Sequence, residues 1–210
     1  MSLSKPSIYM ICPTIRPLMM MDTVKYWFEK SSKTTRMFAI LDVHDISVSG
    51  VGCVVGMLKN IECEKGEDII TFVSDDIYPN ENWDLEMIKA TEDWSGAVMF
   101  KDNIRRGNPI FSNGCITFEA LKKMNRVFIH PDYYHCWSDN ECYDNLIEMG
   151  ILKDASETST LEFDHKHFCL GGRAQDSHDI YYHSRFEEGK ATYERRKKLT
   201  IRQRLELDKI

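Results

Sequence analysis

Residues 69–83 read IITFVSDDIYPNENW, and this stretch decides the fold class. Its first five residues are apolar or β-branched, a pattern that predicts a short buried strand. The strand is followed directly by Ser74, Asp75 and Asp76. In an open α/β sheet, ligands bind at the carboxyl ends of the strands, which is where this acidic pair falls.

The two adjacent carboxylates have two interpretations. Like charges this close repel each other unless a cation or a hydrogen-bond network neutralises them. A hard divalent cation such as Mn²⁺ or Mg²⁺, carrying a substrate diphosphate, is one such partner. A solvated turn before Pro79 explains the acids equally well, because Asp is a common turn residue.

The sequence on either side alternates between strand and helix patterns. Buried strands are predicted at residues 7–12, 37–41, 68–73 and 96–100. One helix is predicted to begin at Asp22 and another to cover residues 47–62. Strands that alternate with helices of this length are typical of a largely parallel sheet covered on both faces. We therefore predict a single α/β domain, with a mostly parallel central sheet flanked by helices.

Two further helices are predicted in the less regular second half of the chain. Thr117 is predicted to cap a short helix, and Ser138 to cap a longer one. Ser138 and Glu141 have the spacing of a capping box, and Gly150 provides the stop. The dipole of this helix favours a carboxylate in its first turn and so predicts a lowered pKa for Asp139.

Residues 161–168 read LEFDHKHF and alternate like a strand. With a period of two, Leu161, Phe163, His165 and His167 share one face. Two histidines that continue a core-facing stripe are expected near a polar cavity, because an unpaired imidazole is costly to bury. Taken alone, these residues are better interpreted as a pair of hydrogen-bonded structural histidines.

The composition is that of an ordinary globular protein. The chain has 210 residues, 42% of them hydrophobic and 29% charged, with a net charge of −6. These values exclude a disordered or collagenous chain, and a protein that coats nucleic acid would be basic overall. Residues 190–210 hold eight Lys or Arg against three Asp or Glu. We interpret them as an amphipathic helix packed through Leu199, Leu205 and Leu207, in preference to a surface that steers anions.

The seven cysteines show no disulfide pattern. Their count is odd and no pair has the spacing CxxC, so we predict reduced cysteines. No run of 18 apolar residues predicts a membrane helix, and the first residues do not resemble a signal peptide. We expect a cytoplasmic protein, of the producing cell or of an infected host, with no membrane partner.

Taken in order, these motifs resemble those of the small GT-A glycosyltransferases of the family-2 kind, which include viral and phage types. Residues 12–17, CPTIRP, resemble the family's opening strand and nucleotide-binding loop, P-T-x-R-P. Residues 69–83 are similar to its metal-binding segment, with an acidic pair in place of a full D-x-D motif. Residues 138–139 fall at its E-D position, and residues 165–167 resemble its late H-x-H strand. The resemblance implies a Rossmann-like GT-A domain.

The resemblance also implies roles for individual residues. Asp139 would be the catalytic base, and Asp76 would bind Mn²⁺ or Mg²⁺ together with His165 and His167, of which His167 is preferred as the direct ligand. The donor-binding residues would be Pro13, Thr14, Arg16, Asp42, Asp45, Asn60, Ser74 and Asp75. The acceptor-binding residues would be Asn113, Gly114, Trp137 and Glu141.

The implied activity is metal-dependent, inverting transfer of a sugar from a nucleotide sugar, with a UDP-sugar favoured. The acceptor would be a hydroxyl of a glycan, a protein or a hydroxymethylated base in phage DNA. Residues 1–189 would form the GT-A domain, with a nucleotide-binding half at about 1–100, an acceptor half at about 101–189, and a basic helix at 190–210. The alternatives are a nucleotidyltransferase-like enzyme and a non-catalytic nucleotide-binding module.

Overall fold

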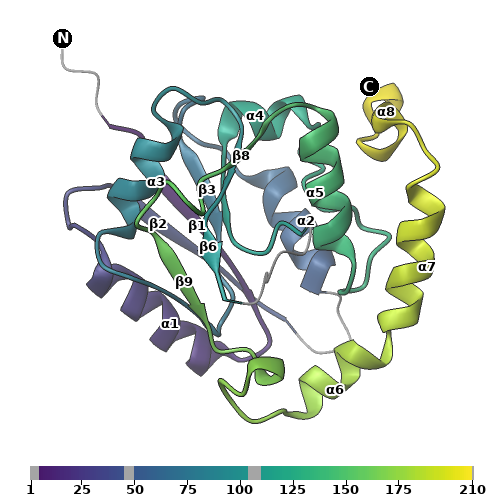
Figure 1. The fold of residues 1–210 in the computed structure, drawn as a ribbon, viewed down its shortest axis with the longest axis horizontal. Coiled ribbons are helices and arrows are strands. Elements are labelled where there is room, and N and C mark those ends of the chain that lie inside the picture. The colour runs from purple at the N-terminus through teal and green to yellow at the C-terminus, as the bar shows by residue number, and fades with distance from the viewer. Residues whose placement is uncertain (1–4, 45–49, 104–109, 210) are drawn as a thin grey trace.

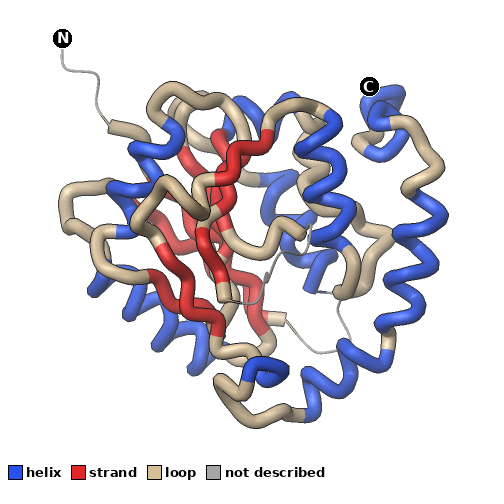
Figure 2. The backbone as a smooth tube through the Cα atoms, in the orientation of Figure 1, coloured by secondary structure: helices blue, strands red, loops and turns tan. Residues whose placement is uncertain are grey.

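A computed structural model describes residues 5–44, 50–103 and 110–209. Its centre is a six-stranded sheet (Figures 1 and 2) with the order β2-β1-β3-β7-β5-β8. The strands are β1 (Ile8–Thr14), β2 (Met37–Val43), β3 (Ile69–Phe72), β5 (Ala97–Met99), β7 (Gly114–Thr117) and β8 (Leu152–Asp154). All of them run in one direction except β7, which is antiparallel to both of its neighbours. The predicted α/β fold with a mostly parallel sheet is confirmed.

Helices cover both faces of this sheet. Side chains alternate along each strand, so apolar residues point to both faces and both need a covering layer. Tyr9 and Ile11 of β1 belong to one core, whereas Ile8, Met10 and Cys12 belong to the other. Figure 1 shows α1 on one side of the sheet and α2 and α5 on the other. The helices are α1 (Pro17–Lys30), α2 (Gly50–Asn60), α3 (Trp83–Thr91), α4 (Phe118–Lys123), α5 (Ser138–Glu148), α6 (Ser177–Ser184), α7 (Phe186–Arg196) and α8 (Ile201–Arg204).

A second, three-stranded sheet brings the acidic pair to the histidines. It contains β4 (Ile77–Pro79), β9 (Glu162–His165) and β6 (Lys101–Asp102), with β9 in the middle. The antiparallel register of β4 and β9 places Ile77 opposite His165. Because Ile77 directly follows Asp76, this pairing carries His165 to the carboxyl end of β3.

The predicted start of the first helix at Asp22 is wrong. Helix α1 begins five residues earlier at Pro17, and Asp22 is an exposed residue inside it. Proline suits the first helical position because its missing N–H would have no partner there. The predicted cap of α4 is confirmed, since Oγ1 of Thr117 accepts a hydrogen bond from the Ala120 N–H at 3.4 Å.

The predicted capping box of α5 is also wrong. The residue before the helix is Trp137, in a left-handed conformation at φ 72°, and no side chain caps the helix. The hydroxyl of Ser138 donates instead to the carbonyl of His135 at 2.9 Å. The carboxylate of Glu141 instead forms an ion pair with the buried Arg196, with Nη2 of Arg196 2.8 Å from Oε1 of Glu141. A charge-assisted pair is stronger than the backbone hydrogen bond that the capping box would supply.

The C-terminal segment contacts the core through Leu205 and Leu207, but it is not the one continuous helix over residues 190–210 that the sequence predicts, and Leu199 is not part of the core. This segment consists of α7, α8 and the 3₁₀ turn η2 (Leu207–Lys209), with Leu205 fully buried in the core. Arg196 and Arg204 are buried and paired with acidic residues of α5, so these two cations do not face solvent. All seven cysteines are free, as predicted. Within the described residues, no helix has the length and apolar character needed to cross a membrane.

Candidate active site

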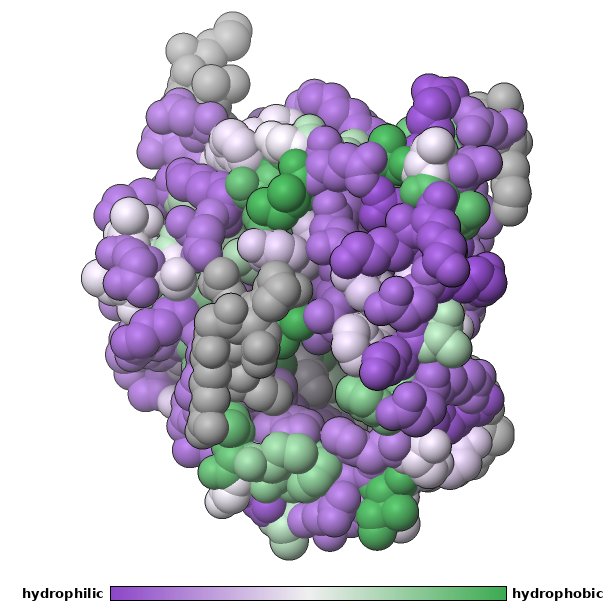
Figure 3. Space-filling model, turned by 45° about the vertical axis from the view of Figure 1, so that its right-hand side comes forward, coloured by the Kyte–Doolittle hydropathy of each residue, from purple (hydrophilic) through white to green (hydrophobic). Residues whose placement is uncertain are grey.

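A cavity of about 680 Å³ opens at the edge of the central sheet where β1 and β3 end. Its walls come from the loops after these strands, from the first turn of α5, and from the segment between β9 and α6. Figure 3 shows the surface hollowed on this side, with apolar and hydrophilic residues around the hollow. Asp76, Asp139, His165 and His167 all line this one cavity.

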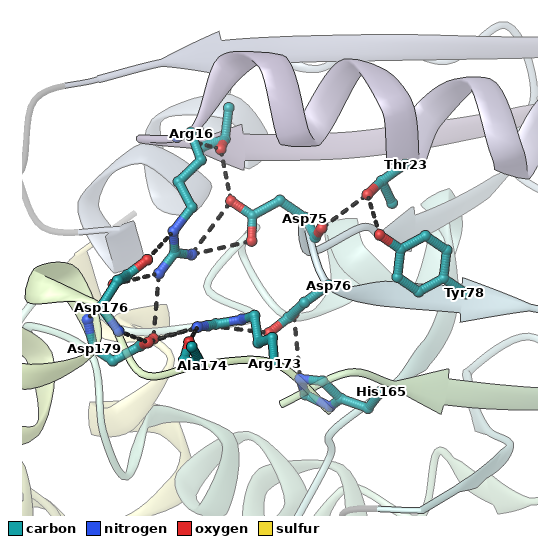
Figure 4. A network of polar contacts seen from close by, with 11 residues as sticks. Arg16, Thr23, Asp75, Asp76, Tyr78, His165, Arg173, Ala174, Asp176 and Asp179 are labelled. Carbon is teal, nitrogen blue, oxygen red and sulfur yellow. Dashed lines mark hydrogen bonds and ion pairs between the residues drawn. The ribbon is translucent and has the colours of Figure 1, made fainter. Parts of the chain in front are cut away.

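Asp75 is held by residues of β1, α1 and the loop between them (Figure 4). The hydroxyl of Thr14 donates to its carboxylate at 3.0 Å, and Nη1 of Arg16 lies 3.2 Å from Oδ1. Thr23 of α1 donates to the Asp75 carbonyl at 2.8 Å. Burial raises the pKa of Asp75, and the nearby Arg16 acts in the opposite direction. The side chain is therefore fixed in one orientation at the end of β3.

Asp76 lies between an imidazole and a guanidinium. Nε2 of His165 is 3.3 Å from Oδ1, and Nη2 of Arg173 is 3.4 Å from Oδ2. Burial acts to raise the pKa of Asp76, but His165, Ser74 and Arg173 more than offset this and hold it at about 2. Asp76 is consequently an anion throughout the neutral pH range, as a metal ligand must be.

Two arginines, Arg16 and Arg173, link the segment after β9 to Asp75 and Asp76. Arg16 binds Asp176 through Nε at 2.9 Å and Asp179 through Nη2 at 3.2 Å. Arg173 binds Asp179 through Nη1 at 2.6 Å. Figure 4 shows the two guanidiniums side by side between the two sets of carboxylates. A line of alternating charges thus joins Asp75 and Asp76 to the start of α6.

Sequence reasoning missed Asp176 and Asp179, although a local pattern marks them. Each carboxylate accepts the backbone N–H of the other, at 2.9 and 3.0 Å. This reciprocal arrangement at the start of α6 is a capping box, and its spacing is visible in the sequence D-S-H-D at residues 176–179. His44 was missed as well. It follows β2 and lines the cavity.

The residues around Asp76 fit a divalent cation. Oδ1 of Asp76 is buried and faces Nε2 of His165 at 3.3 Å, but neither this atom nor Nδ1 of His165, which lies 4.0 Å from Oδ2 of Asp102, makes a hydrogen bond of normal geometry. A buried polar atom without a hydrogen bond is costly, and a carboxylate oxygen is the kind of ligand that Mn²⁺ and Mg²⁺ prefer, with the imidazole of His165 as a further ligand beside it. The His167 ring lies 5.2 Å from the His165 ring, but Nδ1 of His167 accepts the Cys169 N–H at 3.3 Å. The imidazole beside Asp76 is that of His165.

Asp139 occupies the first turn of α5 and lines the cavity. Its Oδ1 accepts the backbone N–H of Asn140 at 3.1 Å, and it has no ion pair to any described residue. Burial raises the pKa of Asp139, and backbone N–H groups offset only part of that effect. The lowered pKa predicted from the helix dipole is wrong, because removal of water from the carboxylate outweighs the dipole of a short helix.

Seven other residues predicted to bind donor or acceptor line the same cavity. They are Pro13, Thr14, Arg16, Ser74, Asp75, Asn113 and Trp137. Asp45 lies outside the described residues. Four remaining residues, Asp42, Asn60, Gly114 and Glu141, are not among those that line the cavity.

Each of these four residues has a structural explanation. Asp42 lies in the edge strand β2, near Cys53 of α2. Asn60 ends α2 and donates to the carbonyl of Gly56 at 2.8 Å. A Cβ on Gly114 would lie 2.1 Å from the Val98 carbonyl, so this glycine permits the approach of β5 to β7. Glu141 is buried against Arg196 and points away from the cavity wall.

The fold is similar to that of a known catalytic domain. No protein-family model and no curated protein sequence matches the chain. Among solved structures, the catalytic domain of Drosophila beta1,4galactosyltransferase 7, in complex with xylobiose, matches with a TM-score of 0.60. The match covers 82% of this chain and 75% of that one, at 13% sequence identity. The chain therefore has the α/β fold of a GT-A catalytic domain.

Proposed function

We propose that the protein is a metal-dependent glycosyltransferase that moves a sugar from a nucleotide sugar to an acceptor hydroxyl, with inversion at the anomeric carbon. The observation that carries this proposal is the shared cavity of Asp76, His165 and Asp139. A buried acid and the imidazole that faces it lie at one wall, and a carboxylate without an ion pair to any described residue lies at another.

The nucleotide end of the donor fits the wall that β1 and β3 form. Thr14, Arg16 and Asp75 are already joined by hydrogen bonds there, so little ordering is needed when a ribose or base arrives. Arg173 is 3.4 Å from Asp76 and would exchange this contact for one with a phosphate oxygen. A UDP-sugar is the donor we propose.

Asp76 and His165 would hold Mn²⁺ or Mg²⁺, and His167 lies near enough to assist. When bound, such an ion stabilises the negative charge that develops on the departing nucleoside diphosphate. Asp76 is suited to this role because it stays ionised, with a pKa of about 2. His165 is positioned by the pairing of β9 with β4 rather than by a loop.

Asp139 would act as the general base. Its carboxylate takes the proton of the acceptor hydroxyl while that oxygen bonds to the anomeric carbon and the bond to the diphosphate oxygen breaks. A base is most effective when its pKa approaches the working pH, and burial moves the pKa of Asp139 in that direction. Displacement in one step implies inversion.

A sugar is the acceptor chemistry that the cavity favours. Trp137, Tyr182 and Phe186 line it, and aromatic faces stack on the apolar face of a sugar ring. The similar galactosyltransferase domain was solved with a disaccharide, xylobiose. We therefore propose a glycan acceptor ahead of a protein or a hydroxymethylated base. We also propose a nucleotide-binding half at about 1–100 and an acceptor half at about 101–189, with His165 and Arg173 of the second half reaching the diphosphate of the donor.

The experiment that tests the proposal is a panel of nucleotide sugars with Mn²⁺, scored by free nucleoside diphosphate. Release of UDP from a UDP-sugar, dependent on the metal and accelerated by a glycan, is the expected result. Release of pyrophosphate from a nucleoside triphosphate would support a nucleotidyltransferase instead. Nucleotide binding without turnover of any donor would identify a non-catalytic module.

A further inference from the structure

Three side chains that bind transition metals converge at the wall of the cavity, where the 3₁₀ turn η1 (Phe168–Leu170) faces α6; His167 and His183 line the cavity, and Cys169 does not. One ligand atom each of His167, Cys169 and His183 lies within 4.8 Å of the other two. His167 precedes η1, Cys169 lies within it, and His183 lies in the last turn of α6. The hydrogen bond from the Cys169 N–H to the His167 imidazole holds the first two on one turn.

The thiol distinguishes this cluster from the site at Asp76. Thiolate is a soft ligand that favours Zn²⁺, whereas Mn²⁺ and Mg²⁺ prefer oxygen ligands. Cys169 is the exposed cysteine among the seven. Burial raises the pKa of the other six thiols, so they stay protonated at neutral pH.

The two histidines of residues 165–167 are directed to different partners. Nε2 of His165 is 3.3 Å from the carboxylate of Asp76. The His167 ring lies 6.3 Å from the ring of His183 and is hydrogen-bonded to the turn that carries Cys169. His165 therefore belongs to the site at Asp76, whereas His167 lies between the rings of His165, at 5.2 Å, and His183, at 6.3 Å, and can act as a ligand in the cluster with Cys169.

We propose that His167, Cys169 and His183 form a second metal site, which binds a borderline-soft divalent cation of the Zn²⁺ class. Cys169 would bind as the thiolate, its proton passing to solvent, and water would occupy the fourth position. The ion would join η1 to α6 and so hold the intervening segment, which carries Arg173 and Asp176, over the cavity. The site does not depend on the proposed glycosyl transfer.

The test is the rate at which a disulfide reagent labels Cys169 in the full chain, with and without Zn²⁺, measured first without Mn²⁺ and then in excess Mn²⁺. One thiol should react rapidly in the parent protein and none in Cys169→Ser. Zn²⁺ should slow this labelling at least about tenfold, and His183→Gln should remove the protection. Cys63→Ser, which alters a partly buried thiol, is the matched control and should behave like the parent protein.

Three results would overturn the proposal. They are no protection by Zn²⁺ in the parent protein, equal protection in His183→Gln, and loss of protection when Mn²⁺ is added. The last would mean that one ion site serves both clusters. Thermal unfolding without metal checks that His183→Gln and Cys169→Ser keep the fold, which the exposure of both residues favours. None of these results depends on sugar transfer, so failure here and failure of the proposed function are distinguishable.

Discussion

Arg196 of α7 and Glu141 of α5 form a buried ion pair across 55 positions of the chain. Nε of Arg196 donates to Oε2 at 2.9 Å and Nη2 to Oε1 at 2.8 Å, and the two side chains are 3% and 4% exposed. The Tyr133 hydroxyl donates to the same carboxylate at 2.6 Å. Because Glu141 lies two residues after Asp139, this pair ties the C-terminal helix to the turn that carries the proposed base.

Arg196→Ala should therefore destabilise the protein strongly. It leaves the Glu141 carboxylate buried without its cation, and losses of this kind cost about 3–5 kcal/mol of unfolding free energy. Urea unfolding at neutral pH measures the loss. Arg195→Ala is the matched control, because Arg195 is 59% exposed in its pair with Asp132 and should change the stability by less than about 1 kcal/mol. Equal losses in the two variants would contradict the role given to the buried pair.

Two glycine-to-alanine changes should have opposite effects on stability. In Gly114→Ala the new Cβ meets backbone, 2.1 Å from the Val98 carbonyl, so β5 and β7 must separate at a cost of about 1–3 kcal/mol. In Gly56→Ala the Cβ meets nothing within 4 Å inside α2, and helix propensity should add about 0.5–1 kcal/mol. Thermal unfolding should show a lower melting temperature for Gly114→Ala and a higher one for Gly56→Ala than for the parent protein. A neutral Gly114→Ala would reopen an acceptor-binding role for Gly114.

The sequence predicted those parts of the fold that local patterns determine. Strands β1, β2, β3 and β5 were found because each is a short apolar run bounded by polar residues, proline or glycine. Strands β4, β6 and β8 have only two or three residues, too few to show a period, and unlike β5, which also has three, they do not lie in a longer apolar run such as that of residues 96–100. The reversed direction of β7 depends on its pairing with β3 and β5, which no local pattern encodes.

The candidate site also combines features that local patterns predict with features that depend on distant parts of the chain. The cavity positions of Asp75, Asp76 and His165 follow from strand ends and alternation, which are local. The predicted strand over residues 161–168 is too long, because β9 ends at His165, and His167 reaches the cavity from the residue before η1. Arg16 contacts Asp176 across 160 positions, so the network around it was not predictable. Glu141 satisfied the spacing of a capping box, but a distant arginine offered a stronger partner. Predictions from local sequence patterns were wrong or incomplete where a charged side chain forms an ion pair with a residue distant in the sequence.

Asp76→Asn should abolish metal-dependent turnover of the donor. An amide offers a neutral ligand in place of the anion, so we expect a fall in kcat/KM of at least about a hundredfold. Manganese binding should weaken in parallel, as measured by the electron paramagnetic resonance signal of free Mn²⁺. Asp164→Asn is the control, since Asp164 is an exposed carboxylate on the opposite face of β9. Unchanged turnover in excess EDTA would refute a metal role for Asp76.

Asp139→Asn should separate catalysis from stability. It keeps the size of the side chain but removes the basic oxygen, so transfer should fall at least about a hundredfold while UDP affinity stays the same. Burial raises the pKa of Asp139 in the folded state, and ionising it therefore costs stability as the pH rises from its unfolded pKa through its folded one. At neutral pH the variant should consequently be as stable as the parent protein or slightly more so. A loss of stability with near-normal turnover would identify Asp139 as a structural residue.

The pH dependence of transfer gives an independent test of the same assignment. A general base must be ionised, so kcat/KM should decline as the pH falls through the folded-state pKa of Asp139. Because burial raises that pKa, the decline should begin above the range of an ordinary aspartate, which titrates near about 4. Asp76 titrates at about 2 and cannot produce this limb. The residual activity of Asp139→Asn should show no such decline, and an unchanged acid limb in the variant would assign the base to another group.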